Sequence, residues 1–149
     1  MIMKTSHSKK NSERSVPEHR VVQAVTDLLV AQRYRVRHEV PNMGQSVDIV
    51  ATRGSWLTCV EAKVRDWSRA ISQCLAHEQV ADFICIAIGI ESVSEGLLRR
   101  VASYGYGLIV YRLSDGTCTW VRAPDRNRRV WQPQRRRLAS NMRKIDYAH

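Results

Sequence analysis

The hydrophobic and polar residues of this chain repeat with two periods, one typical of helices and the other of strands. Apolar residues three and four positions apart predict helices over residues 17–32, 66–77 and 93–104. Pro17 suits the first position of the first helix, and Asp66 is a typical cap for the second. The apolar runs between these segments are too short for helices, and we interpret them as strands.

Apolar runs bounded by glycine, proline or polar turns predict strands at residues 34–40, 47–51, 56–64, 83–88, 108–112 and 117–122. The run Phe83–Ile88 has no polar residue, which is typical of a strand covered on both faces. Asp115-Gly116 predicts a tight hairpin turn, and Pro41–Gly44 predicts a turn or loop. This order of elements predicts an α/β sandwich around a mixed central β-sheet.

Two of these strands carry ionisable residues in otherwise core-like surroundings. Asp48 lies in the second strand, and Glu61 and Lys63 lie in the third. Successive side chains of a strand point to opposite faces, so Glu61 and Lys63 share one face. Burying charged groups is costly unless they pair with each other or bind a metal. The three residues are therefore the candidate site, and a buried ion pair of Lys63 with Asp48 or Glu61 is the structural alternative.

The order Asp, twelve residues, then Glu-Ala-Lys resembles the signature of the PD-(D/E)xK nuclease superfamily, which has the restriction-endonuclease-like fold. The resemblance covers roughly residues 17–88. One departure is Val47, which stands where the family name has a proline. The resemblance implies a restriction-endonuclease-like α/β sandwich.

The resemblance also implies a division of roles among the motif residues. Asp48, Glu61 and the backbone carbonyl of Ala62 would bind Mg²⁺, with Mn²⁺ as the alternative metal. Lys63 would lie beside the attacking water and the scissile phosphate. Hard oxygen ligands and a nearby positive charge are what hydrolysis of a phosphodiester requires.

Two further residues have both a site role and a plainer alternative. The resemblance implies that Glu18, on the first helix, and Gln73, on the helix after Glu-Ala-Lys, belong to the catalytic site. Glu18 is equally well placed as a first-turn acid that complements the helix dipole, and Gln73 as a solvent-facing helix residue. His38 and His77 have no metal-binding spacing, and we interpret both as ordinary polar or packing residues.

The net charge of +10 is concentrated at the two ends of the chain. Residues 16–121 carry equal numbers of acidic and basic side chains, whereas residues 1–15 carry a net charge of +3 and residues 122–149 one of +7. We therefore divide the chain into a disordered basic tail over 1–15, a nuclease-like domain over 16–124 and a basic extension over 125–149. The extension is either a short helix or a flexible arm.

A basic chain end suits a polyanion such as nucleic acid, and a merely solubilising tail is the alternative. Trp131, among arginines, is the candidate for stacking on a base. Arginines beside the motif and in the extension are the other candidates for binding nucleic acid: Arg65, Arg69, Arg128, Arg129, Arg135, Arg136 and Arg137.

Composition argues against several other classes of protein. The four cysteines are scattered without a C-x-x-C pair, which argues against structural zinc and predicts reduced thiols in a cytoplasmic protein. No apolar run approaches the roughly 20 residues that span a membrane. The first residues lack the apolar stretch of a secretory signal.

The leading hypothesis is a Mg²⁺-dependent endonuclease that hydrolyses DNA phosphodiester bonds, with RNA as the alternative substrate. A chain of 149 residues has little room for a separate target-recognition domain. This favours structure-directed cutting of the repair or recombination type, similar to that of small Holliday-junction resolvases, and such enzymes imply a homodimer. The second hypothesis is a catalytically silent nucleic-acid-binding module on the same fold, and the third is an interaction protein that uses its tails.

Overall fold

Six strands form one mixed sheet in which each strand lies beside its neighbours in the sequence. The first three strands are antiparallel, β3, β4 and β5 are parallel, and β6 returns antiparallel to β5. This computed structural model describes residues 17–145. The strands are β1 (Arg35–Asn42), β2 (Gln45–Arg53), β3 (Trp56–Val64), β4 (Phe83–Gly89), β5 (Gly107–Tyr111) and β6 (Cys118–Arg122).

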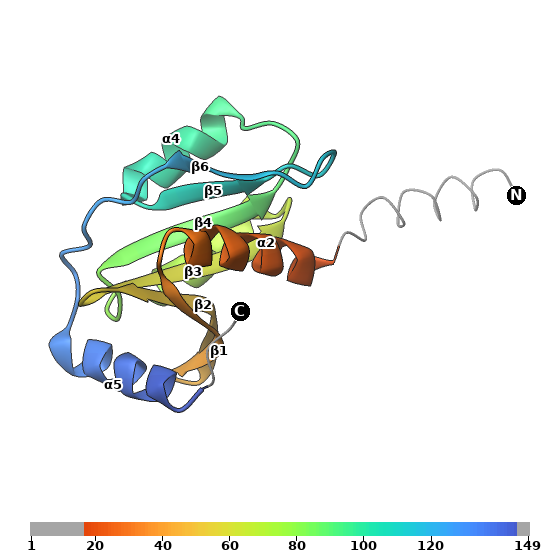
Figure 1. The fold of residues 1–149 in the computed structure, drawn as a ribbon. Helices are drawn as coiled ribbons and strands as arrows, with labels where there is room; N and C mark the ends of the chain where they lie inside the picture. Colours follow the sequence, from red (N-terminus) through yellow and green to blue (C-terminus); the bar gives the residue numbers. More distant parts are fainter. Residues whose placement is uncertain (1–16, 146–149) are drawn as a thin grey trace, which may run out of the picture.

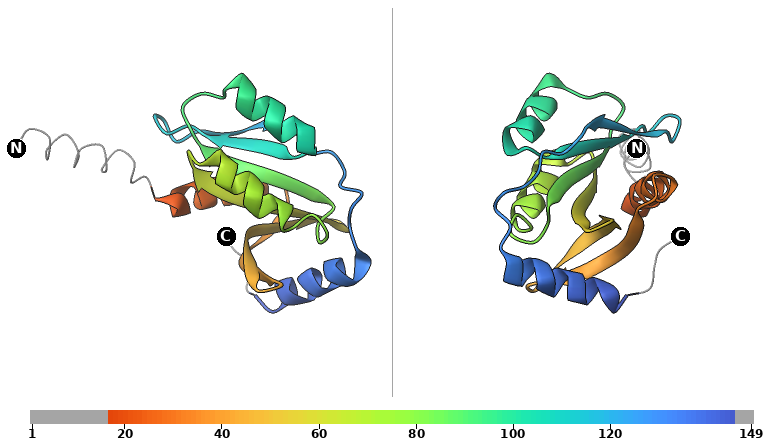
Figure 2. Two further views of the ribbon diagram at one scale, coloured as in Figure 1. Left: turned by 180° about the vertical axis from the view of Figure 1, so that it is seen from behind. Right: turned by 60° about the vertical axis from the view of Figure 1, so that its left-hand side comes forward.

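The two faces of the sheet are covered by different helices. α2 (Glu18–Ala31) lies across the face seen in Figure 1 and packs Val21, Val25 and Leu29 against the sheet. The view from behind in Figure 2 shows α3 (Trp67–Leu75) and α4 (Glu95–Tyr104) on the other face. Because both faces are buried, β4 is apolar throughout. The predicted α/β sandwich around a mixed sheet is confirmed.

Of the two alternatives for Pro41–Gly44, the structure shows the turn, and it is shorter than that segment. β1 continues to Asn42, and a two-residue turn of Met43 (φ 52°) and Gly44 (φ 82°) leads into β2. Positive φ at both central residues is the geometry that suits the twist of a hairpin. As a result Asn42 is a buried strand residue and not part of an exposed turn.

The predicted cap at Asp66 occurs in the structure, with slightly different helix bounds. The Asp66 carboxylate accepts a hydrogen bond from the backbone N–H of Arg69 at the start of α3. At the start of α4, the Ser94 hydroxyl accepts one from the backbone N–H of Leu97. The helix α3 ends at Leu75, so residues 76–82 form the connection to β4 and not a continuation of the helix.

The basic extension folds back onto the sheet as a helix, α5 (Gln132–Arg143), which lies beside β1 (Figure 1). Leu138 is only 1% exposed and joins the same hydrophobic cluster as α3 and α4. The side-chain amide of Asn141 donates to the carbonyl of Pro41 at 2.9 Å. Arg135 forms an ion pair with Asp82 at 2.7 Å. Of the two alternatives for this segment, the structure shows the helix.

Some expectations from the sequence concern residues that the structure does not describe. The basic tail over residues 1–15 lies outside the described range, as do residues 146–149. Between residues 17 and 145 no helix has the length and apolar character to cross a membrane. The four cysteines are free thiols, and three of them are buried.

Truncating Leu138 tests whether α5 stabilises the domain. Leu138→Ala is expected to lower the free energy of unfolding by about 2–5 kcal/mol, because the side chain is fully buried. The matched control is Arg137→Ala, one residue away on the exposed side of α5, which should change it by less than about 0.5 kcal/mol. Urea denaturation measures both, and equal effects of the two substitutions would show that α5 adds nothing to stability.

Candidate active site

The register of β2 and β3 brings Asp48 and Glu61 together. The ladder between the two strands ends at the pair Ile49 and Val60, and Asp48 and Glu61 are the next residues along. In place of a further ladder bond, the Asp48 carboxylate accepts a hydrogen bond from the backbone N–H of Ala62 at 2.9 Å. The side chain of Asp48 therefore lies in the position where the two strands part.

Glu61 is a buried carboxylate with a specific partner. It is 2% exposed, and its Oε1 lies 2.6 Å from Nε2 of His77. The other ring nitrogen of His77 lies 2.8 Å from the side-chain nitrogen of Asn42. An amide nitrogen only donates, so Nδ1 of His77 accepts and Nε2 carries the ring proton. His77 therefore donates to Glu61 and leaves the other carboxylate oxygen for a different partner.

Burial and mutual contact set the protonation of this group. Burial and a hydrogen bond with the Glu61 carboxyl raise the pKa of Asp48 to about 7, against the Ala62 N–H and the charge of Lys63, which lower it. Burial also raises the pKa of Glu61, against the effect of Asp48 and Lys63. Burial lowers the pKa of His77 to about 4, so its imidazole is neutral at pH 7. Two close carboxyl groups that share a proton are a typical surrounding for a cation.

Lys63 lies at the end of the same strand and contacts the first helix. Its ammonium group is 3.2 Å from the Glu18 carboxylate and is mostly buried. Its charge lowers the pKa of both Asp48 and Glu61, so it acts on the same site. The structure thus connects Glu18 to the site through Lys63, and Glu18 is also the acid in the first turn of α2.

Gln73 is partly buried on α3, and its Oε1 is a buried oxygen without a hydrogen-bond partner among the described residues. A solvent-facing glutamine would have water as its partner. A buried amide oxygen that accepts nothing is costly, which is the pattern of a group that meets a ligand or a substrate.

The oxygen atoms present suit Mg²⁺. Among residues 17–145, no three His, Cys, Asp or Glu side chains are placed to bind a metal together. The carbonyl of Ala62 supplies a further oxygen, because in a strand the N–H and C=O of one residue point to the same side and its N–H faces Asp48. Two carboxylates and one carbonyl suffice for Mg²⁺, which keeps several waters and also binds substrate phosphate. The residues therefore fit the metal that the resemblance implies.

The basic residues proposed from the sequence divide into two groups. Arg65 and Arg69 are exposed and follow Lys63 in the chain, where β3 turns into α3. In contrast, Arg129 forms an ion pair with Glu78 at 2.9 Å, and the Arg135 guanidinium is held between Asp82 and the carbonyl of Ser55. The remaining members of the proposed set are exposed along or just before α5: Arg128, Trp131, Arg136 and Arg137.

The two residues that sequence reasoning missed are His77 and Asn42. The sequence predicts an ordinary polar or packing residue at position 77, whereas in the structure His77 holds Glu61 in place. The sequence places Asn42 in a turn or loop, whereas in the structure it ends β1 and orients His77. They are 35 residues apart in the sequence, so no local pattern connects them. The only signal in the sequence was that each of the two is a polar residue close to the end of a predicted element.

Comparison with solved structures shows the fold. An SPO1766 protein of unknown function from Silicibacter pomeroyi superposes with a TM-score of 0.65 at 18% identity, over 86% of this chain and 84% of that one. An XisH family protein from Nostoc punctiforme superposes with a TM-score of 0.52 at 14% identity, over 68% of this chain and 98% of that one. No family model and no curated protein matches the sequence. At these identities the likeness extends to the fold alone.

Replacing Asp48 tests the charge state of the site. The pKa of Asp48 rises from 3.8 to about 7 on folding, so between these values the folded protein holds the proton more tightly than the unfolded chain. The contribution of Asp48 to the free energy of unfolding should therefore fall as the pH rises from about 4 to about 7. Asp48→Asn removes this titration and should be more stable than the wild type by a margin that grows across that window.

The measurement is urea denaturation in EDTA at several pH values, so that no cation binds the carboxylates. Asp27→Asn, at an exposed position of α2, is the matched control. A margin for Asp48→Asn that does not change with pH would contradict the assignment.

Proposed function

We propose that this chain is a Mg²⁺-dependent endonuclease that hydrolyses phosphodiester bonds of DNA, on the pattern of the PD-(D/E)xK superfamily. The single observation that carries the proposal is the meeting of Asp48, Glu61 and Lys63 at the end of β3, with Asp48 bonded to the backbone of Ala62 and Glu61 to His77. An ion-pair network alone would be a costly use of so many buried polar groups. Its fit to a cation and an anionic substrate is the simpler explanation.

Each residue has a role that follows from its contacts. Bound Mg²⁺ would supply an activated water and a sink for negative charge on the phosphate. Asp48 and Glu61 would hold it through their carboxylate oxygens, and Ala62 through its carbonyl. Lys63, whose charge acts on both carboxylates, would orient the water and stabilise the charge that develops on the phosphate.

Glu18 and Gln73 would act at the edge of the site. The ion pair with Glu18 fixes the position of the Lys63 ammonium before substrate binds. The partnerless oxygen of Gln73 would accept a hydrogen bond from a metal-bound water or from Lys63. Both are positioning roles.

The nucleic acid would contact exposed basic residues at both ends of β3. Arg65 and Arg69 are the first candidates for phosphate contacts because they follow the motif directly. The start of α5 lies at the other end of β3, where Arg135 bonds to Ser55. Arg136 and Arg137 would bind a more distant part of the nucleic acid there, with Trp131 as a stacking residue that is 53% exposed. A homodimer that cuts two strands of a branched or damaged duplex would suit a domain of this size.

A catalytically silent nucleic-acid-binding module is the second candidate function. The observation that favours it is the Lys63–Glu18 ion pair, which neutralises the ammonium group that catalysis requires. The two candidates differ in one property, since only the nuclease shortens its substrate in the presence of a divalent cation.

Cleavage of a panel of labelled substrates separates the two. The panel contains linear duplex, single strand, flap, four-way junction and RNA, each incubated with Mg²⁺, Mn²⁺ or EDTA. Metal-dependent cutting is expected, and the best substrate would name the preferred shape. Binding without cutting under every metal would replace the nuclease with the binding module.

Lys63→Ala is expected to lower the cleavage rate by about 100-fold or more, because it removes the charge that stabilises the transition state. Binding of the uncut substrate in EDTA should change little. Lys144→Ala, at an exposed lysine at the end of α5, is the control of the same chemistry. Cleavage that survives in Lys63→Ala would mean that another site in the sample does the cutting.

Substitutions of His77 test its role in positioning Glu61. His77→Leu removes the donor to Glu61 and should raise the Mg²⁺ concentration for half-maximal cleavage by about 10–100-fold. His77→Gln keeps an N–H donor and should recover part of that loss. An equal requirement for Mg²⁺ in the wild type and both variants would show that His77 only fills space.

A further inference from the structure

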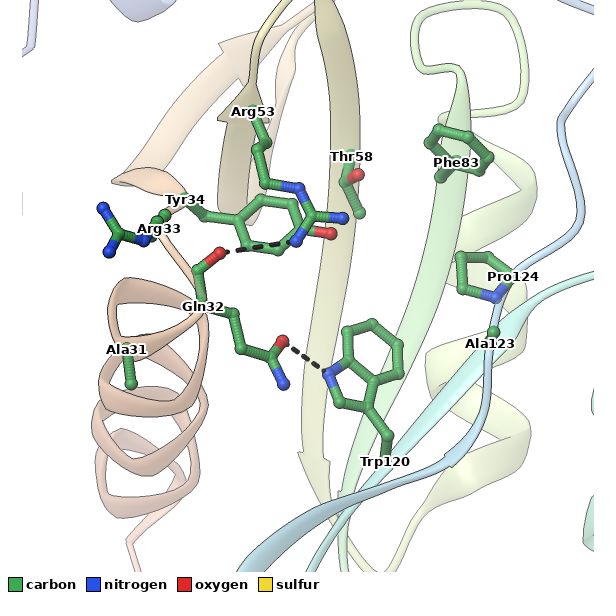
Figure 3. Close-up of a pocket in the computed structure, with 10 residues that line it drawn as sticks. All are labelled: Ala31, Gln32, Arg33, Tyr34, Arg53, Thr58, Phe83, Trp120, Ala123 and Pro124. Atoms are coloured by element: carbon green, nitrogen blue, oxygen red, sulfur yellow. Dashed lines mark hydrogen bonds between the residues drawn. The ribbon is translucent and has the colours of Figure 1, made fainter.

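A second feature of interest is a cavity of about 650 Å³ at the end of β3 opposite to the proposed active site. It lies where α2 ends and Thr58 begins the central part of β3 (Figure 3). Lys63 is five residues further along β3, which is about 16 Å at the rise of an extended strand. We call this cavity the aromatic cleft, after its lining residues Tyr34, Phe83 and Trp120.

One wall of the aromatic cleft is a stacked pair. The guanidinium carbon of Arg53 lies 4.3 Å from the centroid of the Tyr34 ring. Its Nη1 donates to the backbone carbonyl of Gln32 at 3.3 Å, and Figure 3 shows the guanidinium reaching toward the middle of the cleft. A guanidinium that is held flat against a ring is a ready platform for a planar aromatic ligand.

The floor and the far wall of the aromatic cleft are formed by rings, and the one polar N–H among them already has a hydrogen-bond partner. The indole N–H of Trp120 donates to the side-chain oxygen of Gln32 at 2.9 Å, which fixes the orientation of the ring (Figure 3). Phe83 and Pro124 lie on the opposite side of the cleft from Tyr34. A flat ligand would thus find apolar surface on one side and the Arg53–Tyr34 pair on the other.

The charged residues of the aromatic cleft indicate which group a ligand would carry besides its aromatic ring. Its lining includes Arg33 and Arg53 but no aspartate or glutamate. The side chain of Arg33 points away from the centre of the cleft, so Arg53 is the lining cation that faces it (Figure 3). Aromatic rings and an inward-facing guanidinium suit an aromatic base that carries a phosphate.

The aromatic and cationic surface continues beyond the cleft. The Phe83 ring lies 5.6 Å from that of Trp56, which is 44% exposed, and the guanidinium of Arg126 lies 5.1 Å from the Trp56 ring. A row of rings interleaved with arginines is the pattern of a surface on which successive unpaired bases stack. A ligand longer than one nucleotide could therefore follow it.

We propose that the aromatic cleft binds an unpaired nucleotide, with the base between the Arg53–Tyr34 pair and the rings of Phe83 and Trp120. The source is either a free mononucleotide or an unpaired stretch of a nucleic-acid strand. The site is separate from the proposed active site, and it needs neither the metal nor the cleavage activity of that site.

Binding of a labelled oligothymidylate to the full chain in EDTA, followed by fluorescence anisotropy, tests the proposal. Arg53→Glu and Trp120→Leu should each weaken binding by about tenfold or more, since stacking contributes about 1–3 kcal/mol per base. The matched control is Arg100→Glu, an equal charge reversal on α4, which covers the other face of the sheet. It should leave the affinity within about twofold, because solvent ions screen distant surface charges.

Competition with adenosine monophosphate and with inorganic phosphate identifies the source. If the mononucleotide binds with an affinity similar to that of the oligonucleotide, the ligand is a free nucleotide. If the oligonucleotide binds far more tightly than the mononucleotide, the ligand is an unpaired strand. Equal weakening by Arg53→Glu and Arg100→Glu would overturn the proposal, as would displacement by inorganic phosphate as effective as that by the mononucleotide. Because every arm is run in EDTA, these outcomes do not depend on whether Lys63 supports cleavage.

Discussion

The buried carboxylate of Glu61 is the constraint on which much of this structure depends. It lies on a central strand beneath α3, where an unpaired charge would cost several kcal/mol. Its donor is His77, which the connection after α3 delivers, and His77 in turn depends on Asn42 at the end of β1. The short helix and the two-residue turn at Met43–Gly44 are therefore matched to one another, since the first is followed by the donor to Glu61 and the second follows the residue that orients that donor.

Two groups of residues with different chemistry lie at opposite ends of the central strand β3. At one end of β3, carboxylates and an ammonium group are held at fixed positions by backbone and side-chain hydrogen bonds. At the other end, rings and arginines line an open cavity. Strands that are buried on both faces are rigid, so the spacing between the two ends does not vary.

The order of elements was predictable because its signals are local. Alternation, the Asp115-Gly116 turn and the caps at Asp66 and Ser94 each act within a few residues. The partners of the site residues were not predictable, because nothing in the local sequence distinguishes a histidine that fills space from one that binds a carboxylate. The same limit applies to Arg135. The sequence places it among arginines that are candidates for binding phosphate, whereas in the structure its guanidinium closes the domain by pairing with Asp82.

That closure has a consequence for the order in which the chain folds. The backbone carbonyl of Ile145 accepts from Arg37, 108 residues earlier, and Asn141 reaches Pro41 across 100 residues. Until α5 has been synthesised, the Asp82 carboxylate lacks its guanidinium partner and the core beside β1 stays open to water. Contacts of such separation form late and slow the search for the native state. During synthesis β1 therefore lacks its packing partner until α5 has been made. A nascent chain in which β1 to β6 have already formed still exposes apolar residues beside β1.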